Sequence, residues 1–455
     1  MNTEAAPRPP MRRVALAVMI GTTIEWFDFL IYGAAAALVF APLFFPSVSS
    51  VAGTLLAFST FAVGFGARPI GGMVMGHFGD RLGRKKMLVV SLTIMGLSTF
   101  VIGLLPTYDQ IGIWAPILLI LMRLLQGFGV GGEWGGAVLT AVEHATPGKR
   151  GLFGSLPQMG VPAGLLLSTG AFLAVSQLPD EQFLSWGWRI PFLSSIVLVM
   201  VGLFVRLKLT ETPTFERVKQ SRTEVKIPLV TALRTYPKQI ILATGSMIST
   251  GGYFYIVNTY AITYGTTTKA FSRNQMLIAV LVSAVVSVVA LPYFGALSER
   301  FGRRRLILIG LAAMAVWIYP TFLAVDSGNL QVLVLVYAVG AVFFSVSYGP
   351  QSTFIAELFD ARVRMSAAST SFQMGVLLGG ALAPIIATAL VAASGTSVSV
   401  AVYVSVLSAI SFLSVLAVTH SSTERGSADM GPGAAEWAGA TATLTTTPTD
   451  GGARK

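Results

Sequence analysis

Long apolar segments follow one another along almost the whole chain and are separated by short polar loops. A membrane helix needs about 20 apolar residues to cross the hydrocarbon layer, and these segments reach that length. They do not alternate polar and apolar residues, as the strands of a membrane barrel would. The pattern predicts twelve membrane helices, at about residues 14–44, 52–76, 87–105, 113–142, 152–176, 188–207, 238–264, 275–296, 306–325, 329–355, 366–393 and 397–419.

The first apolar segment is too long for the apolar part of a signal peptide, and it contains Glu25 and Asp28. We therefore predict that it is a retained helix.

Composition agrees with a membrane protein, because 54% of the 455 residues are hydrophobic and only 11% are charged. The net charge of +11 comes from basic residues spread over many short loops. If the N-terminus is cytoplasmic, most Lys and Arg residues fall on the cytoplasmic side, as the positive-inside rule requires. We therefore predict a multi-pass cell-membrane protein with both termini in the cytoplasm and no nucleic-acid partner. The chain has no cysteine, which excludes disulfides.

A long charged segment divides the spans into six and six, and the last part of the chain is rich in Gly, Ala, Ser and Thr. Such a tail lacks the apolar residues needed to order itself. The predicted organisation is a cytoplasmic tail at 1–11, a six-helix bundle at 12–207, a cytoplasmic linker at 208–237, a second six-helix bundle at 238–419 and a disordered cytoplasmic tail at 420–455.

The two halves repeat each other. The loop 76–86 reappears in altered form at 295–305, and the stretch 143–150 reappears at 357–364. Gln158-Met159-Gly160 likewise corresponds to Gln373-Met374-Gly375. Since each half has six spans, both cross the membrane in the same direction, which predicts a parallel repeat about an axis along the membrane normal.

The loop Gly76–Lys86 resembles the cytoplasmic loop signature of the major facilitator superfamily, and Arg123–Gly127 resembles its fourth-helix motif. Four further stretches are similar to the metabolite:proton symporter family, with details closest to shikimate-type organic acid transporters: 25–33, 67–72, 131–136 and 186–192. The resemblance implies the all-α major facilitator fold of twelve helices in two parallel repeats. It also implies proton-coupled transport of organic acids such as shikimate, citrate or 2-oxoglutarate, or of proline and betaine.

Charged residues inside predicted helices are few, and each costs about 2.5–3.5 kcal/mol at a helix centre on insertion scales. Glu25, Asp28 and Tyr32 share one face of the first helix. Two neighbouring carboxyl groups favour a proton carrier, and the alternative is that basic partners keep both ionised for packing. The sequence does not distinguish the two carboxyls.

The fourth predicted helix carries a polar stripe of Arg123, Gln126 and Glu133. A guanidinium group can form two parallel hydrogen bonds with one carboxylate, so Arg123 is a candidate for substrate binding. The resemblance implies a role in proton coupling instead, and a purely structural ion pair with Asp28 or Glu25 is a third possibility. Arg68, near the end of the second helix, is expected to extend to the membrane interface rather than contact substrate.

The second half has no charged residue in the middle of its spans, so we expect it to contribute neutral hydrogen-bonding groups. The predicted set for proton coupling is Glu25, Asp28, Glu133 and Arg123. The predicted substrate-binding set is Tyr32, Arg123, Gln126, Gln158, Tyr255, Asn258 and Gln373.

The two repeated loops are predicted to gate the cytoplasmic side through ion networks made in one conformation and broken in the other. Gly76 and Gly83 are expected at tight turns, and Glu299 is expected to face the start of the fifth helix near Gly151. The alternative is that the basic residues only set the topology. The gating set is Gly76, Asp80, Arg81, Gly83, Arg84, Glu143, Arg150, Glu299, Arg300, Gly302, Arg303, Glu357 and Arg364.

The three histidines are far apart and have no ligand spacing, and no phosphate-binding glycine motif is present. We therefore expect no metal, no cofactor other than the proton gradient, and no enzymatic activity. The predicted function is import of a small organic acid by proton symport through alternating access, by a monomer in the lipid bilayer. A proline or betaine symporter is the alternative within transporters, and a membrane-embedded enzyme or receptor is the alternative outside them.

Overall fold

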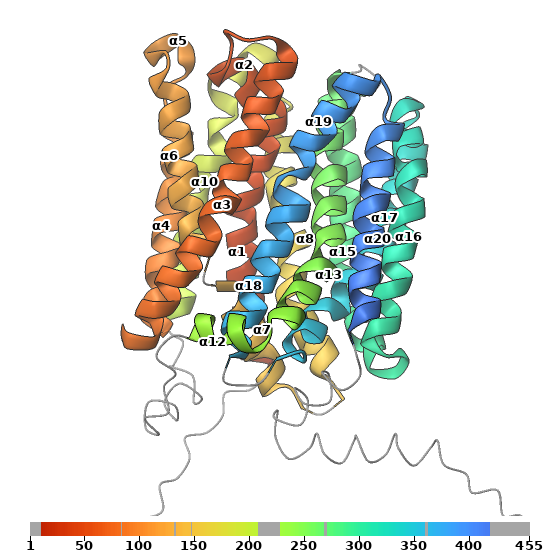
Figure 1. The fold of residues 1–455 in the computed structure, drawn as a ribbon. Helices are drawn as coiled ribbons and strands as arrows, with labels where there is room; N and C mark the ends of the chain where they lie inside the picture. The colour runs from red at the N-terminus through yellow and green to blue at the C-terminus, as the bar shows by residue number, and fades with distance from the viewer. Residues whose placement is uncertain are drawn as a thin grey trace, which may run out of the picture.

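The protein is described by a computed structural model that covers residues 11–82, 84–131, 133–146, 148–207, 228–267, 271–359 and 363–418. Within these residues the chain forms helices joined by short loops, and it forms no strand. The described chain begins and ends at the same end of the molecule, which is the lower end in Figure 1.

The first half consists of long helices with short ones at its turns. Its elements are α1 (Met11–Leu38), α2 (Phe40–Phe44), α3 (Ser50–Leu82), α4 (Arg84–Leu104), α5 (Tyr108–Ile111), α6 (Trp114–Val130), α7 (Glu133–His144), α8 (Arg150–Val175), α9 (Asp180–Gln182), η1 (Phe183–Gly187) and α10 (Arg189–Leu207).

The second half has the same general plan. Its elements are α12 (Pro228–Thr235), α13 (Pro237–Tyr255), η2 (Ile256–Tyr260), α14 (Ala261–Thr267), α15 (Arg273–Phe301), α16 (Arg303–Asp326), α17 (Leu330–Ala356), α18 (Arg364–Val376), η3 (Leu377–Ala381), α19 (Ala383–Ser394) and α20 (Val398–Ala417). The short helix α12 falls inside the predicted linker 208–237 and lies at the lower end of the molecule (Figure 1).

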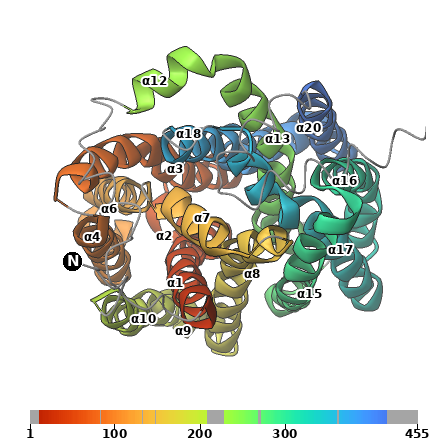
Figure 2. The same ribbon diagram turned by 90° about the horizontal axis from the view of Figure 1, so that it is seen from below.

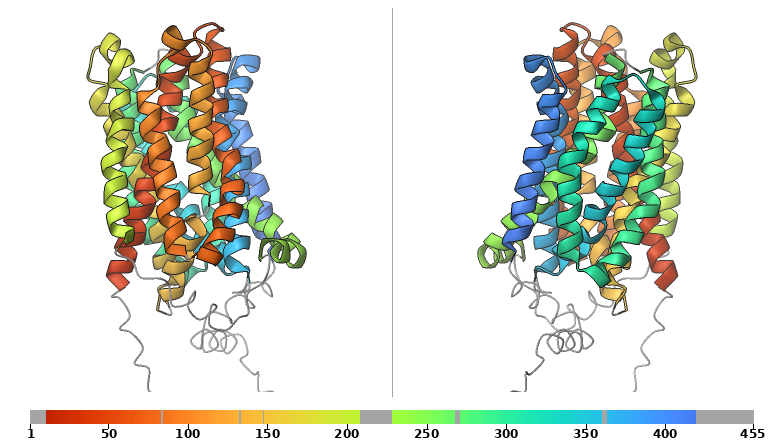
Figure 3. Two further views of the ribbon diagram at one scale, coloured as in Figure 1. Left: turned by 90° about the vertical axis from the view of Figure 1, so that its left-hand side faces the viewer. Right: turned by 90° about the vertical axis from the view of Figure 1, so that its right-hand side faces the viewer.

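The long helices run side by side from one end of the molecule to the other (Figure 3). The helices of the first half and those of the second form two groups, which is clearest from below (Figure 2). The two groups meet where α8 packs along α15 and where α7 packs on α18. Across the same interface α3 packs on α18, η3 and α19, and α8 also packs on α17.

Eight helices of the described part are long and apolar enough to cross a membrane, and the bent pair of α9–η1 with α10 would make a ninth. The apolar stretches Val89–Leu104 and Trp114–Val130 are shorter, and α1 spans 28 residues. These helices match the twelve predicted spans in order, so the all-helical membrane architecture is confirmed.

One predicted turn is wrong. Gly76 was expected to end the second span, but α3 continues through it to Leu82. The helix therefore extends beyond the apolar stretch to Leu82, and α4 begins at Arg84; residue 83 lies outside the described residues.

Two close helix crossings hold the site in place. A side chain at Gly127 of α6 would overlap the carbonyl oxygen of Gly64 on α3, and one at Gly379 of η3 would overlap the carbonyl oxygen of Ile248 on α13. Glycine at these crossings lets membrane helices approach closely. The π-helical segments η2 and η3 interrupt two predicted spans of the second half, a feature that is frequent at functional sites.

Candidate functional site

Two arginine side chains meet in the interior of the first half. Arg68 on α3 and Arg123 on α6 have exposed fractions of 1% and 0%, and both guanidinium carbons lie 3.9 Å from the centre of the Phe29 ring. Phe65 lies 4.6 Å from the Arg68 guanidinium, and Tyr32 lies 4.1 Å from that of Arg123. Aromatic faces attract cations, so these rings stabilise the two positive charges away from water.

The aromatic contacts leave guanidinium N–H groups without acceptors. Nε and Nη2 of both Arg68 and Arg123 are buried and have no hydrogen-bond partner among the described residues. Buried donors without acceptors are costly, and the cost is larger when the donor is charged. The cluster therefore offers at least four N–H groups to an incoming acceptor, most favourably to an anion.

Gln126 fixes the position of Arg123. Its side-chain oxygen accepts a hydrogen bond from Nη1 of Arg123, and its amide donates to the main-chain oxygen of Asp28 and to Oγ1 of Thr99, both at 2.8 Å. Gly64 leaves room for the guanidinium, because a side chain at that position would overlap Nε of Arg123. Four helices, α1, α3, α4 and α6, thus determine where this charge lies.

The two carboxyl groups of α1 have different surroundings. Glu25 is within electrostatic reach of Arg68 and Tyr348. Asp28 is fully buried, and neither of its carboxyl oxygens has a hydrogen-bond partner among the described residues. An ionised carboxylate without a partner is expensive in a membrane interior. This asymmetry between the two carboxyls was not resolved by the sequence.

Tyr255 of α13 brings a side chain of the second half to the arginines. Its ring lies 5.3 Å from that of Phe61 and 5.4 Å from that of Phe65, and it interacts electrostatically with both guanidinium groups. Its hydroxyl is buried and makes no hydrogen bond among the described residues. The structure thus places Tyr255 at the arginine cluster, facing it from across the interface between the halves.

A second group of contacts crosses the interface nearer the lower end. The ring of Trp134 on α7 stacks on that of Phe372 on α18, with centroids 3.8 Å apart and planes 10° apart. The indole N–H of Trp134 donates to Oε1 of Gln158 at 3.0 Å, while Nε2 of Gln158 has no partner among the described residues. Gln373 donates to the main-chain oxygen of Gly131 at 3.4 Å. Gln158 and Gln373 therefore border this aromatic stack.

Asn258 lies away from the arginines. Its amide donates to the main-chain oxygen of Phe254 at 3.0 Å, and its oxygen accepts from Ser283 at 3.1 Å. It lines a small cavity of about 20 Å³ together with Tyr253 and Tyr337. The structure does not bring Asn258 together with Arg68 and Arg123.

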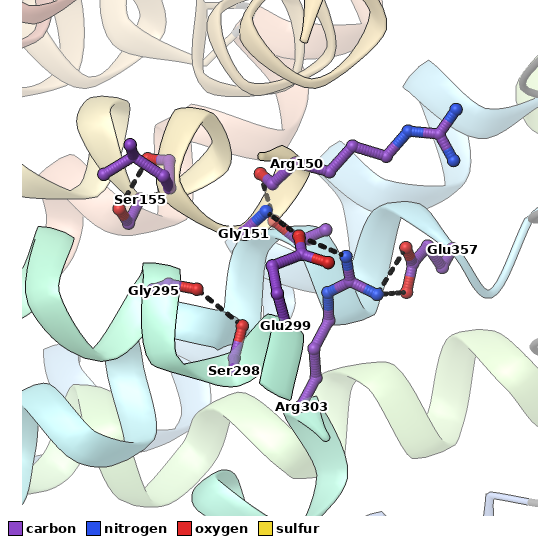
Figure 4. A network of polar contacts seen from close by, with 10 residues as sticks. Arg150, Gly151, Ser155, Gly295, Ser298, Glu299, Arg303 and Glu357 are labelled. Atoms are coloured by element: carbon purple, nitrogen blue, oxygen red, sulfur yellow. Dashed lines mark hydrogen bonds and ion pairs between the residues drawn. The ribbon is translucent and has the colours of Figure 1, made fainter. Parts of the chain in front are cut away.

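The lower-end network contains the contact expected from the repeat, as Figure 4 shows. The main-chain N–H of Gly151 donates to Oε1 of Glu299 at 2.5 Å. Arg303 lies between two carboxylates, 3.0 Å from Glu299 and 2.7 Å from both oxygens of Glu357. Since Gly151 belongs to the first half, these contacts join the halves.

Other members of the gating set differ in their burial and in the contacts they make. Burial raises the pKa of the Glu357 carboxyl, and the nearby charge of Arg303 lowers it in part. Arg364 is buried and donates from Nε to the main-chain oxygen of Phe359 at 3.0 Å. Arg300 is exposed, and Gly302 has a φ of 86°, which a residue with a side chain rarely adopts. Thr353 also donates to the main-chain oxygen of Arg150, at 3.3 Å.

Several predicted residues lie outside the described side chains. They are Gly76, Asp80, Arg81, Gly83, Arg84, Glu133 and Glu143.

The prediction for Arg68 was wrong. The side chain is 1% exposed and lies among aromatic rings instead of extending to the interface. Its position in the sequence contained a usable signal, because Phe61, Phe65 and Arg68 share one face of α3. A polar residue on a buried aromatic face is a stronger candidate for function than one at a helix end.

The chain matches known transporter families. The family described as Sugar (and other) transporter matches residues 14–237, and the Major Facilitator Superfamily matches residues 268–448. The inner membrane metabolite transport protein YhjE of Escherichia coli is 42% identical over 92% of this chain and 96% of its own length. The shikimate transporter of Escherichia coli is 42% identical over 86% of this chain and 91% of its own length.

Other relatives carry different cargo. A glycine betaine/proline/ectoine/pipecolic acid transporter of Dickeya dadantii is 35% identical over 89% of this chain and 83% of its own length.

The fold is similar to that of the xylose transporter XylE of Escherichia coli, with a TM-score of 0.69, 16% identity and coverage of 89% of this chain and 98% of that one. The twelve-helix fold and the transporter class are therefore confirmed, and the chain belongs to the major facilitator superfamily.

Proposed function

We propose that the protein imports a small organic acid together with protons by alternating access. The observation that carries the proposal is the pair of buried guanidinium groups of Arg68 and Arg123, whose Nε and Nη2 atoms have no acceptor among the described residues. A carboxylate supplies such acceptors and neutralises the charge. The cargo is a shikimate-like acid or another mono- or dicarboxylate.

The position of Tyr255 supports a binding site between the halves. Its ring lies against Phe61 and Phe65 and its buried hydroxyl has no hydrogen-bond partner among the described residues, so the hydroxyl is available as a third donor to a carboxylate held by Arg68 and Arg123. Tyr32, Gln126 and Gln158 complete the first-half side of this site, and Gln373 lies at its lower border. Binding between repeats near the middle of the membrane is the usual arrangement in such transporters.

The shikimate transporter among the relatives favours an organic acid, whereas the relatives named for betaine and proline favour a zwitterion. A betaine carrier needs open aromatic faces to hold a quaternary ammonium. In this protein the rings of Phe29, Tyr32 and Phe65 already contact the two guanidinium groups. The organic acid is therefore the better candidate, and the zwitterion remains the second.

Asp28 of α1 is the first candidate for the proton carrier. The carboxyl group of Asp28 is buried and has no hydrogen-bond partner among the described residues. The free-energy cost of keeping it in the membrane interior is therefore lower when it is protonated and neutral. Glu25 and Glu133 are the other candidates. No cofactor beyond the proton gradient is needed for this cycle.

We infer that the molecule lies in the cell membrane with its lower end and both termini in the cytoplasm, because the predicted loops on that side carry most of the Lys and Arg residues. The bundles are residues 12–207 and 238–419, with a linker at 208–237 and a tail at 420–455, and the transport unit is a monomer. The gating set closes the cytoplasmic side when the halves meet there and opens it when they separate, which is how a two-state carrier alternates.

Uptake into proteoliposomes tests the proposal. A panel of labelled shikimate, 2-oxoglutarate, proline and glycine betaine is measured with an acidic exterior and without a pH gradient. We expect accumulation of an organic acid only with the gradient, and loss of uptake in Arg123→Ala with normal membrane insertion. Accumulation of betaine or proline but of neither acid would favour the zwitterion carrier.

A further inference from the structure

The positive and negative side chains around Arg68 and Arg123 do not balance when one of the carboxyl groups is protonated. Arg68 and Arg123 contribute two positive charges, and both guanidinium groups lie 3.9 Å from the same Phe29 ring. Glu25 contributes one negative charge within electrostatic reach of Arg68. Asp28 is linked to the cluster through Gln126, which bonds both the Arg123 guanidinium and the Asp28 main chain. Among these four side chains, one positive charge therefore remains when Asp28 is protonated.

The helices packed around α1 bring few other ionisable groups to this region. Within the described side chains, α8 and α10 carry ionisable residues only near their ends, at Arg150 and Arg189, and on α4 Lys86 lies at the lower end. On η2 and α14 the ionisable groups are the phenols of Tyr260 and Tyr264. Glu133 of α7 lies outside the described side chains.

This count distinguishes four states of the cluster. With Asp28 ionised and the site empty, two positive and two negative charges cancel. With Asp28 protonated and a monovalent anion bound, the charges cancel again. The empty protonated site has one excess positive charge, and the loaded unprotonated site has one excess negative charge. Uncompensated charge is costly inside a membrane protein, so the two balanced states change conformation most readily.

We propose that the carrier moves one monovalent carboxylate with one proton, so that each import cycle carries no net charge. This inference rests on the proposed function and specifies its cargo and stoichiometry. A dicarboxylate would leave the loaded site one charge too negative unless a second proton came with it. A zwitterion with one proton would leave it one charge too positive. Glu25 is the residue that sets this balance, because it offsets one of the two arginines.

Separate electrical and chemical gradients test the inference on the wild-type protein in proteoliposomes. Labelled shikimate, a monocarboxylate, is offered with an acidic exterior at zero membrane potential. It is then offered with a valinomycin potassium potential, negative inside, at equal pH. We expect the pH gradient to raise the initial rate by roughly tenfold and the potential to change it by less than about twofold.

The outcomes distinguish a failure of the one-to-one stoichiometry from a failure of proton symport itself. Stimulation by the potential alone, comparable to that by the pH gradient, means that net positive charge enters, and it would overturn the one-to-one balance while leaving proton symport intact. Absence of any effect of the pH gradient on acid uptake would instead remove the proposed function and this inference with it. Proton-driven uptake of 2-oxoglutarate without uptake of shikimate would overturn the monovalent cargo and leave proton symport of an organic acid intact.

A charge variant gives a second readout. Glu25→Gln keeps the shape of the side chain and adds one positive charge to the site. The ratio of 2-oxoglutarate binding to shikimate binding, measured by thermal shift, is expected to rise by about tenfold. An unchanged ratio in a folded variant would contradict the role of Glu25, and the gradient experiment on the wild type decides the stoichiometry even if the variant does not fold.

Discussion

Arg123 and Asp28 are joined through one side chain: Gln126 accepts a hydrogen bond from the Arg123 guanidinium and donates one to the Asp28 main-chain oxygen at 2.8 Å. We therefore expect a movement of the arginine on binding an anion to reach the helix that carries the proposed proton site. The same amide also donates to Thr99, so both N–H groups of the Gln126 side chain are engaged.

The first prediction concerns this link. Gln126→Leu removes the acceptor for Arg123 and both amide bonds, and hydrogen bonds to charged groups contribute about 1.5–3 kcal/mol. We expect uptake of the transported acid to fall by roughly tenfold or more. The matched control is Gln177→Leu, an exposed glutamine at the end of α8, which should transport normally. Equal uptake by both variants would show that Gln126 has no role.

The second prediction uses two neighbouring glycines of α3. In Gly64→Ala the added methyl group overlaps Nε of Arg123, whereas in Gly66→Ala it meets nothing within 4 Å. Alanine is favoured over glycine in a helix by about 1 kcal/mol, so neither change should weaken α3 itself. We expect Gly64→Ala to lose most of its uptake and Gly66→Ala to keep it. The initial rate at equal protein content in the membrane is the readout.

Sequence and structure agree best where a pattern repeats along the chain. The twelve spans follow from apolar length alone, and the contact of Glu299 with Gly151 follows from the repeat. The burial of Arg68 and the difference between Glu25 and Asp28 did not follow, because they depend on which neighbouring helix supplies a partner. Sequence spacing assigns residues to a face of a helix, but it does not say what lies opposite that face. Asn258 illustrates this, since its hydrogen bonds are made to Phe254 and Ser283.

The third prediction concerns the stack of Trp134 on Phe372, which joins the halves near the lower end. Stacked aromatic pairs contribute about 0.5–1.5 kcal/mol beyond the area they bury. Trp134→Ala should therefore favour the conformation that is open to the cytoplasm. The chain has no cysteine, so a single Ser371→Cys, at a buried serine of α18, reports access. We expect a polar maleimide to label it several times faster in the Trp134→Ala background, and equal rates would contradict a gating role of the stack.

The fourth prediction is a pH dependence at the lower end. Burial raises the pKa of Glu357 when the halves are closed, and Glu299, Arg150, Arg303 and Arg364 are the charged groups that act on it. When the lower end opens, water restores the ordinary pKa, so the closed state binds the proton more tightly. Closure is then favoured at low pH and weakened as the pH rises through the raised pKa.

Labelling of Ser371→Cys should accordingly become faster as the pH rises through the raised pKa of Glu357, above the ordinary range of a glutamate carboxyl, after correction for the reactivity of the thiol with a free cysteine standard. Glu357→Gln should abolish the corrected pH dependence. A dependence that persists unchanged in Glu357→Gln would assign it to another group.

The most direct test of proton-coupled import is the comparison of two transport modes in Asp28→Asn. Asparagine keeps the size of the side chain and removes the exchangeable proton. We predict that the variant no longer accumulates the transported acid when the exterior is acidic, yet still exchanges labelled for unlabelled acid across the membrane at a rate within a few fold of wild type. Accumulation driven by the pH gradient at the wild-type level would contradict the account.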